Sequence, residues 1–388
     1  MRSLSDTIRR LTLMHPQAVQ IQHEGQVSRL RDFEWQGANP GTLKAKAYLP
    51  IGLEGNRPLV VVLHGCTQTA AGYDRGSGWS TLADQAQFAL LFPEQQRSNN
   101  PNLCFNWFQP GDTRRGAGEA QSICEMIEAF AAQHSVDHRR IFITGLSAGG
   151  AMTSAMLAAY PDVFAGGAII AGLAAGIAQT VPQAFDRMRG HNNPTSLELQ
   201  THIRNASNHS GPWPTVSVWH GSADQTVLLG NMDLIVEQWS ALHKVARAPD
   251  LIETVDGHVH EIWRNEAGQN VIETYCISGM GHGTPLATKS APSYGTSGPF
   301  MLEAGISSTL RIAQFWDICD AMQLSSQSED SPQSGCASQA IQPTVFASVT
   351  AGNAMAFGHE TSRTVAPTNQ VKVQKVIEDA LRNAGLLK

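Results

Sequence analysis

The stretch "RIFITGLSAGGAM", Arg140 to Met152, places one serine where a strand pattern changes into a helix pattern. The apolar run before Ser147 is typical of a buried strand, and the small residues after it begin a segment with helical spacing. Gly145 and Gly149 stand two residues to either side of the serine. Glycines there let a sharp turn close and leave the hydroxyl exposed above a sheet. The pattern predicts a nucleophile elbow, although a bare Gly-x-Ser-x-Gly string also fits a turn without chemistry.

Strand and helix patterns alternate along the rest of the chain. Apolar or alternating runs predict strands at 31–35, 43–50, 58–64, 88–93, 140–145, 166–172 and 215–221. Helical spacing occurs at 118–133, 148–160, 231–243 and 306–319. The segment "VHEIWRNEAGQNVIETYCI", 259–277, predicts an antiparallel hairpin. The fold class is therefore α/β, with a mostly parallel sheet, helices on both of its faces and a late hairpin.

Composition divides the chain into four segments. Residues 28–322 are predicted to form one catalytic domain, and 1–27 an N-terminal segment. Residues 323–368 are rich in Ser, Gln, Thr and Pro and predict a linker or loop, and 369–388 predict a C-terminal helix.

Composition also limits the class of protein. The chain has 388 residues, of which 42% are hydrophobic, enough for a large buried core. Lys and Arg number 27 against 33 Asp and Glu, without a long basic run, so nucleic acid is not expected as a partner. No apolar run is long enough to cross a membrane, and charges at Asp6, Arg9 and Arg10 interrupt the first residues, so neither an anchor nor a signal peptide is expected. Six scattered cysteines leave the compartment open.

A serine nucleophile needs a histidine base and a carboxylate that orients the base, and in this architecture they follow in the order Ser, Asp or Glu, His. Asp224 in "VSVWHGSADQTV" comes directly after a buried strand, where ligand-facing loops of parallel sheets gather. Asp233 and Glu237 fall in the next predicted helix, where a solvated face explains them, and Asp256 falls in a predicted turn. Asp224 is the candidate acid.

His282 is the candidate base, because the glycine-rich loop "SGMGHGTP" can project its side chain. His220 is expected to pack near Asp224 at a strand end. His258 and His260 resemble a metal pair, but alternation along a strand places both on one face, and no third ligand is apparent. We interpret them as an exposed strand face and predict neither a metal nor a cofactor.

The segment "VVVLHGCTQTAAGYDRGSGW" follows the first strongly apolar strand. Hydrolases of this architecture place a second oxyanion donor in such a loop. The backbone amides of Cys66 and Ala148 are the candidate donors, and the alternative is a plain His-Gly turn.

Five motifs together resemble the polyhydroxybutyrate (PHB) depolymerase-type esterases, relatives of feruloyl and acetylxylan esterases in the α/β-hydrolase superfamily. They are "LHGCTQTAAGYDRGSGW", "PEQQRSNNPNLCFNWFQPGDTRRGAGEA", "TGLSAGGAM", "VWHGSADQTV" and "GMGHGTPL", within about 43–322. The resemblance implies the same nucleophile, acid, base and oxyanion amides. It also implies a Cys66–Cys104 disulfide under oxidising conditions, and a Trp107 that lines the substrate crevice; an ordinary core tryptophan is the alternative.

The predicted activity is that of a serine carboxylic ester hydrolase that forms an acyl-enzyme on short-chain or hydroxyalkanoate esters. A feruloyl or acetylxylan esterase, a serine peptidase or acyltransferase, and a non-catalytic protein of the same fold are the alternatives. The polar segment 173–214 predicts an open rim suited to short acyl groups, which Tyr294 and Phe300 are expected to contact. The resemblance implies an extracellular location, against a cytoplasmic one without it, and the oligomeric state is left open.

Overall fold

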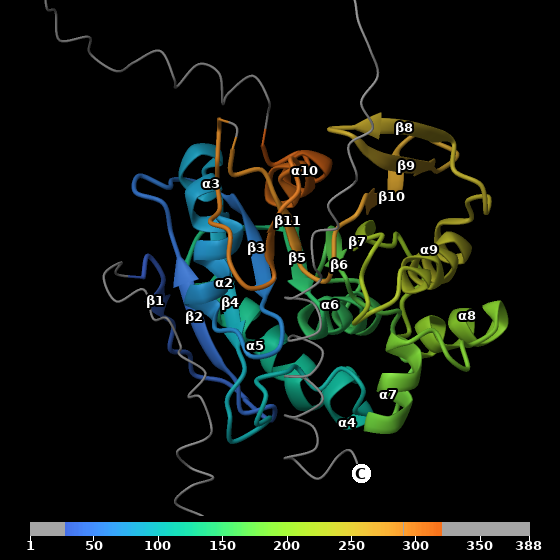
Figure 1. Cartoon of the computed structure of the whole chain (residues 1–388). Helices are drawn as coiled ribbons and strands as arrows, with labels where there is room; N and C mark the ends of the chain where they lie inside the picture. Colours follow the sequence, from blue (N-terminus) through green and yellow to red (C-terminus); the bar gives the residue numbers. More distant parts are fainter. Residues whose placement is uncertain (1–27, 290, 320–388) are drawn as a thin grey trace, which may run out of the picture.

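A ten-stranded sheet runs through the part of the chain that this computed structural model describes, residues 28–289 and 291–319 (Figure 1). The strands follow one another across the sheet in the order β1 (Arg31–Asp32), β2 (Lys44–Tyr48), β4 (Ala89–Glu94), β3 (Arg57–Leu63), β5 (Val136–Leu146), β6 (Gly166–Ile170), β7 (Thr215–Gly221), β10 (Asn270–Ile277), β9 (His258–Arg264) and β8 (Leu251–Val255). The six strands from β4 to β10 pair in parallel. Antiparallel pairs complete the sheet at both edges.

Strand β3 shows how the core is divided, because its alternate residues belong to two different hydrophobic clusters. Leu59 and Val61 pack in one cluster with α5 (Gly118–Gln133), α6 (Ala148–Ala159) and α9 (Gly230–His243). Val60 and Val62 pack in the other with α2 (Ala70–Ser77), α3 (Trp79–Ala86) and α10 (Ser308–Phe315). Successive side chains of a strand point to opposite faces. The continuous apolar run therefore results from helices on both faces of the sheet (Figure 1).

The predicted strands and the late hairpin are confirmed, since β9 and β10 pair antiparallel through a turn at 265–269. Two differences concern the segments around them. Strand β8 was not predicted, and it pairs outside β9. The last described helix, α10, covers only part of the predicted 306–319.

The polar segment 173–214 contains two helices that the sequence analysis did not predict, α7 (Val181–Met188) and α8 (Ser196–Asn205). Thr195 and Glu198 form a capping box at the start of α8, and the Thr-x-x-Glu spacing is the signal that could have found it. The remaining elements are α4 (Pro110–Thr113) and a small parallel pair, β11 (Thr284–Leu286) with β12 (Met301–Glu303). The predicted linker and C-terminal helix at 323–388 lie outside the described residues.

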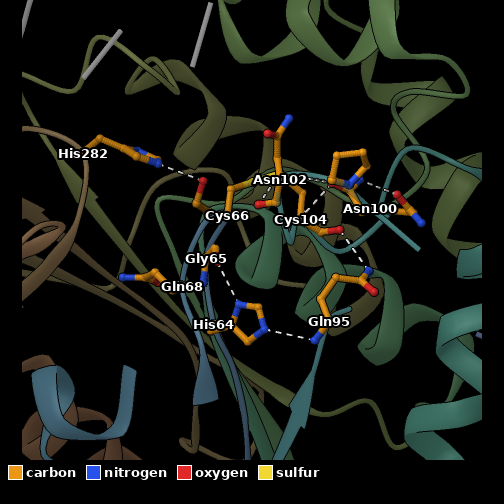
Figure 2. The surroundings of a disulfide bond; sticks show 12 residues. His64, Gly65, Cys66, Gln68, Gln95, Asn100, Asn102, Cys104 and His282 are labelled. Atoms are coloured by element: carbon orange, nitrogen blue, oxygen red, sulfur yellow. Dashed lines mark hydrogen bonds between the residues drawn. A yellow bond between two sulfur atoms is a disulfide. The ribbon is translucent and has the colours of Figure 1, made fainter. Parts of the chain in front are cut away.

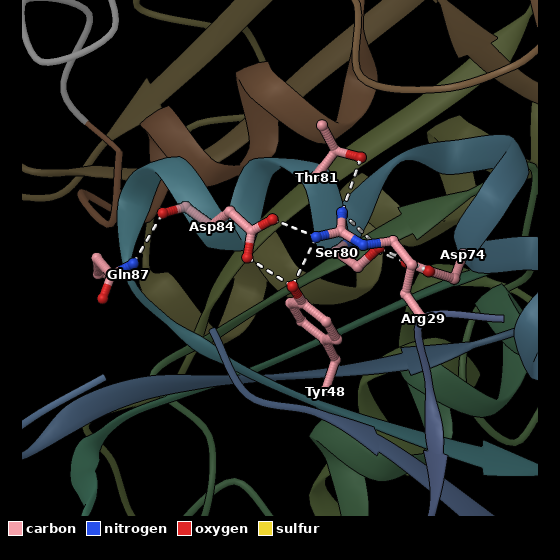
Figure 3. A network of polar contacts seen from close by, with 7 residues as sticks. All are labelled: Arg29, Tyr48, Asp74, Ser80, Thr81, Asp84 and Gln87. Atoms are coloured by element: carbon pink, nitrogen blue, oxygen red, sulfur yellow. Dashed lines mark hydrogen bonds and ion pairs between the residues drawn. The ribbon is translucent and has the colours of Figure 1, made fainter. Parts of the chain in front are cut away.

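Arg29 fastens the first described residues to the domain (Figure 3). Its guanidinium pairs with Asp84 on α3, donates to Tyr48 Oη at 2.6 Å and lies 4.7 Å from the centroid of the Tyr48 ring. Tyr48 also donates to Asp84 Oδ1 at 2.6 Å. Burial, together with the Asp84 carboxylate, raises the pKa of Tyr48 to about 12. Strand β2 and helix α3 are thus tied together at the edge of the sheet.

Within the described residues, no helix combines the length and the apolar character that a membrane span requires.

Candidate active site

Ser147 occupies the turn between β5 and α6 with a strained backbone, φ 57° and ψ −117°. A Cβ on Gly145 would lie 2.4 Å from the carbonyl oxygen of Gly149, and a Cβ on Gly149 would lie 2.5 Å from the backbone of β3. Both contacts are shorter than a side chain tolerates, so the turn can close only with glycine at these positions. Every residue of α6 is buried, which fixes the helix directly behind the serine.

Loops at the carboxyl ends of β7 and β10 bring Asp224 and His282 to this serine. Ser147 Oγ lies 2.8 Å from His282 Nε2, and His282 Nδ1 lies 2.7 Å from Asp224 Oδ2. The backbone N–H groups of Thr226 and Val227 donate to Asp224 Oδ1 at 2.8 and 2.9 Å. Nδ1–H of His282 therefore donates a hydrogen bond to the carboxylate, and Nε2 accepts a hydrogen bond from the serine hydroxyl. The three predicted residues form the chain of hydrogen bonds that a serine nucleophile requires.

Asp224 is 2% exposed. Burial alone would raise the pKa of its carboxyl, but the charge of His282 and the hydrogen bond from it lower the pKa below the usual range. Asp224 is therefore ionised near neutral pH and able to orient the histidine. Two of the carboxylates weighed against it have partners elsewhere: Asp256 pairs with Arg311 and Glu237 accepts from Ser196.

His220 packs against Asp224, as predicted. Its Nε2 lies 2.7 Å from the carbonyl oxygen of Val227 and 3.6 Å from Asp224 Oδ2. Burial lowers the pKa of His220, so a neutral ring donates to Val227. This ring supports the loop that carries Asp224.

The two candidate oxyanion amides belong to the segment after β3 and to the first turn of α6. The side chain of Gln68 accepts from the N–H of Gly65 at 2.8 Å, and the carbonyl of Asn102 accepts from the N–H of Thr67 at 2.7 Å. No hydrogen bond within the described residues uses the N–H of Cys66 between them. The N–H of Ala148, at the start of α6, has no acceptor within the helix.

A disulfide joins Cys66 to Cys104, as the resemblance implied (Figure 2). It connects the segment after β3 to the loop 95–107. His64 stiffens the same region, because its Nδ1–H donates to the carbonyl of Gly65 at 2.8 Å and its Nε2 accepts from the N–H of Gln95 at 3.1 Å. The segment that carries the candidate oxyanion amide of Cys66 is therefore held by the disulfide on one side and by His64 on the other.

Glu119 was not singled out from the sequence, yet its buried carboxylate accepts hydrogen bonds from several residues of the loop 95–107. The backbone and side-chain N–H groups of Asn106 both donate to its carboxylate at 2.8 Å, Gln95 donates at 2.6 Å and Asn99 at 3.1 Å. Burial raises the pKa of Glu119 to about 8, and these hydrogen bonds act against that rise. The three amide side chains and Glu119 all belong to the motif "PEQQRSNNPNLCFNWFQPGDTRRGAGEA". This grouping of amides with one glutamate is the sequence signal that could have found the network.

Trp107 is 8% exposed and belongs to the same core cluster as Ala148. Its ring meets Phe108 edge to face, with centroids 5.7 Å apart.

Tyr294, which was expected to contact the acyl group, is instead buried in the opposite cluster, where its hydroxyl donates to Gln85 at 3.1 Å. The predicted contact between Tyr294 and the acyl group is therefore wrong, because the tyrosine ring packs in the core.

The prediction of an exposed strand face at His258 and His260 is wrong. Strand β8 extends the sheet beyond β9, the ring of His260 stacks on that of Tyr275, and both histidine side chains are buried. His260 lies 3.0 Å from Glu253 and 3.0 Å from Glu273, while His258 Nε2 donates to the carbonyl of Ala304 at 2.8 Å. Burial alone would lower the pKa of His260, but the hydrogen bonds and charges of the two glutamates raise it. The described residues contain no group of three or more His, Cys, Asp or Glu placed to hold a metal ion.

Several known proteins that this chain resembles are named as esterases or depolymerases. The family model described as "Esterase PHB depolymerase" matches residues 43–251. The chain is 45% identical over 284 residues to poly(3-hydroxyalkanoate) depolymerase C of Paucimonas lemoignei, covering 73% of this chain and 68% of that protein. It is 30% identical to an acetylxylan esterase of Coprinopsis cinerea, covering 67% of this chain and 70% of that protein. The solved structure of an acetyl xylan esterase from Aspergillus awamori matches with a TM-score of 0.63 at 23% identity, covering 75% of this chain and 99% of that one. That likeness shows the α/β-hydrolase fold.

Proposed function

We propose, from the premise that this chain belongs to the PHB depolymerase family of esterases and is a carboxylic ester hydrolase, that Ser147 is its nucleophile. His282 is the general base, and Asp224 is the carboxylate that orients it. The observation that carries these roles is the continuous pair of short hydrogen bonds, 2.8 Å from serine to histidine and 2.7 Å from histidine to aspartate.

The reaction begins when Ser147 Oγ transfers its proton to His282 Nε2 and attacks the ester carbonyl carbon. The carbonyl oxygen becomes an oxyanion, which accepts hydrogen bonds from the N–H groups of Cys66 and Ala148. Each such donor is worth about 3 kcal/mol at the transition state. The helix dipole of α6 favours negative charge at the same place.

The tetrahedral intermediate collapses when His282 Nε2–H protonates the leaving alcohol oxygen. The acyl group remains on Ser147, and the alcohol departs. A water molecule then gives a proton to His282 Nε2 and attacks the acyl carbonyl. The second collapse restores the serine hydroxyl and releases the carboxylic acid.

Short-chain and hydroxyalkanoate esters are the substrates that we propose. The support is the 45% identity to a protein named poly(3-hydroxyalkanoate) depolymerase, together with the polar residues of the segment 173–214. Methylenes that extend over a polar rim stay in water and contribute none of the roughly 0.8 kcal/mol that each buried methylene supplies. Activity on p-nitrophenyl esters should therefore peak at short acyl length and decline before dodecanoate. A steady rise through palmitate would contradict this substrate class.

The first test is Ser147→Ala, with Ser154→Ala as a matched control. Ser154 lies within α6, the helix that begins directly after Ser147; it is fully buried, and its hydroxyl has no hydrogen-bond partner within the described residues. We expect the Ser147 variant to lose ester hydrolysis and labelling by a fluorophosphonate while keeping its melting temperature. The control should keep both activities. Near wild-type hydrolysis by Ser147→Ala would overturn the proposed roles.

A substrate panel separates the alternatives: p-nitrophenyl butyrate, soluble 3-hydroxybutyrate oligomers, feruloyl and acetylxylan esters, and peptide anilides. We expect the butyrate and hydroxybutyrate esters to be turned over with the highest kcat/KM. A preference for acetylated xylan would favour the function named for the Coprinopsis cinerea relative. Hydrolysis of anilides alone would indicate a peptidase.

An extracellular or otherwise oxidising location is also part of the proposal. Its support is the Cys66–Cys104 bond, because disulfides form and persist in oxidising compartments. Mass spectrometry of non-reduced peptides from the native host tests it, and two free thiols would count against it.

A further inference from the structure

Phe300 lies directly beside the histidine of the site. Its ring centroid is 6.2 Å from that of His282, and the two ring planes make an angle of 82°. The N–H of Thr284, two residues after the histidine, donates to the carbonyl of Phe300 at 2.8 Å. The segment that carries the histidine and the segment that carries the phenylalanine are therefore fixed to each other.

The backbone of Phe300 is strained, with φ at 61°. The left-handed region is sterically unfavourable for an L-residue with a bulky side chain, and glycine or asparagine would occupy it more readily. A Cβ on Gly283 would lie 2.7 Å from the Phe300 carbonyl oxygen, so the two segments also cross at close range. Strained backbone of this kind is found where the surrounding structure imposes it, and it clusters at functional sites.

The ring itself is only half-buried. It packs on the cluster that contains Met301 and Tyr294, its centroid lies 6.2 Å from that of His282, and the side chain keeps part of its surface exposed to solvent. The strained backbone thus presents a partly exposed aromatic ring next to the imidazole. An apolar group that approaches His282 can bury that exposed part.

The proton transfer from His282 determines which half of the ester lies beside Phe300. His282 Nε2–H must protonate the leaving oxygen, so that oxygen has to come within about 2.6–3.2 Å of Nε2. The acyl half is bonded to Ser147, and its carbonyl oxygen faces the amides of Cys66 and Ala148. A ring packed against His282 therefore lies on the alcohol side of the ester.

We infer that Phe300 is a specificity-determining residue for the alcohol half of the substrate, which in a hydroxyalkanoate oligomer is the next hydroxyacyl unit. This inference rests on the proposed roles of Ser147 and His282. It reassigns Phe300 from the acyl contact that the sequence suggested to the departing alcohol. Tyr294 is not expected to contact the substrate, since its ring is buried and its hydroxyl is hydrogen-bonded to Gln85.

The test compares two substrate series. In the first, the acyl group is always butyryl and the alcohol is methanol, butanol or phenol. In the second, the alcohol is always p-nitrophenol and the acyl group is acetyl, butyryl or hexanoyl. In Phe300→Ala we expect the ratio of kcat/KM for phenyl butyrate to that for methyl butyrate to fall about fivefold to tenfold, the range of an aromatic contact with its buried area. The ratios within the acyl series should change less than twofold.

Deacylation gives an independent readout, because the acyl-enzyme no longer contains the alcohol. The rate of decay of a preformed butyryl-enzyme should be the same in Phe300→Ala and wild type. Phe300→Tyr should retain the wild-type alcohol ratio. Leu302→Ala, a truncation in the neighbouring strand β12, is the matched control and should leave both ratios unchanged.

Phe300→Gly provides the same readout if the alanine variant does not fold, because glycine accepts a φ of 61° without strain. The inference is overturned if the alcohol ratio stays constant while the acyl ratios shift, or if Leu302→Ala reproduces the effect. Failure of the proposed function is distinguishable from either outcome. It would be seen as activity that survives in Ser147→Ala, whatever the alcohol ratio of the Phe300 variants.

Discussion

Replacing Asp224 with asparagine tests how the carboxylate controls the histidine. The side chain keeps its shape, but one oxygen becomes an NH₂ group. Two backbone N–H groups donate to Oδ1 at 2.8 and 2.9 Å, so the amide oxygen has to occupy that position. The NH₂ group is then placed at Oδ2, 2.7 Å from His282 Nδ1.

An NH₂ group can only donate a hydrogen bond, so His282 has to present the lone pair of Nδ1 to it. The ring proton then resides on Nε2, which faces Ser147 Oγ at 2.8 Å. In that tautomer Nε2 cannot accept the proton of the serine. The same change in the chymotrypsin-type triad costs about 10⁴ in kcat, which corresponds to about 5 kcal/mol at 1.36 kcal/mol per factor of ten. We expect a loss of that size here.

The assay is kcat on p-nitrophenyl butyrate, with the melting temperature measured on the same samples. Asp233→Asn and Asp256→Asn are matched controls, because both carboxylates follow Asp224 in the chain and neither contacts His282. They should keep activity within about twofold of wild type. A kcat for Asp224→Asn within tenfold of wild type, at an unchanged melting temperature, would refute the tautomer argument. So would a large loss in either control.

Three further predictions concern the supporting structure. The Cys66→Ser/Cys104→Ser double variant should lose about 4 kcal/mol of unfolding free energy in urea, the chain-entropy estimate for a separation of 38 residues; an unchanged midpoint would contradict it. Gly149→Ala should fold with a loss of about 1–3 kcal/mol and little activity, because its Cβ meets the backbone of β3; wild-type esterase rates would exclude that clash. Glu253→Gln should lower the melting temperature near pH 5.5 and leave it unchanged near pH 9. The raised pKa of His260 means that the ion pair stabilises the folded state at low pH and is lost as the pH rises through the folded-state pKa. Because Glu253 is part-exposed, the effect should not exceed about 1 kcal/mol, and equal shifts at both pH values would disprove it.

Local patterns were sufficient wherever the fold depends on local periodicity. The apolar run in β3 and the spacing of α5 predicted buried elements at the correct places, because a strand between two helical layers and a helix with one buried face carry their own signatures. Helices α7 and α8 bury few residues, Ala184 in the first, Leu199 and Ile203 in the second. Their apolar stripe is too short to stand out from a polar segment.

The candidate site was predictable because its residues follow a fixed order along the chain and each comes directly after a strand. The burial of His258 and His260 could not be predicted in the same way. It depends on β8 and on the carbonyl of Ala304, which is 46 positions away from His258. Burial that results from such distant contacts leaves no periodic trace in the sequence around the residue.

The separation of the site residues also bears on how the enzyme is synthesised. Ser147 and His282 are 135 positions apart, so a ribosome adding about 5–20 residues per second makes the serine roughly 7–27 s before the histidine. During that interval the nascent chain holds Ser147 without the histidine that we propose as its base. Its hydroxyl stays a poor nucleophile even where the elbow has already folded. With the proposed roles, we expect ester hydrolysis to begin only after the loop that follows β10 has been translated and has reached the edge of the sheet. The onset of activity in a translation reaction would then report the completion of that edge.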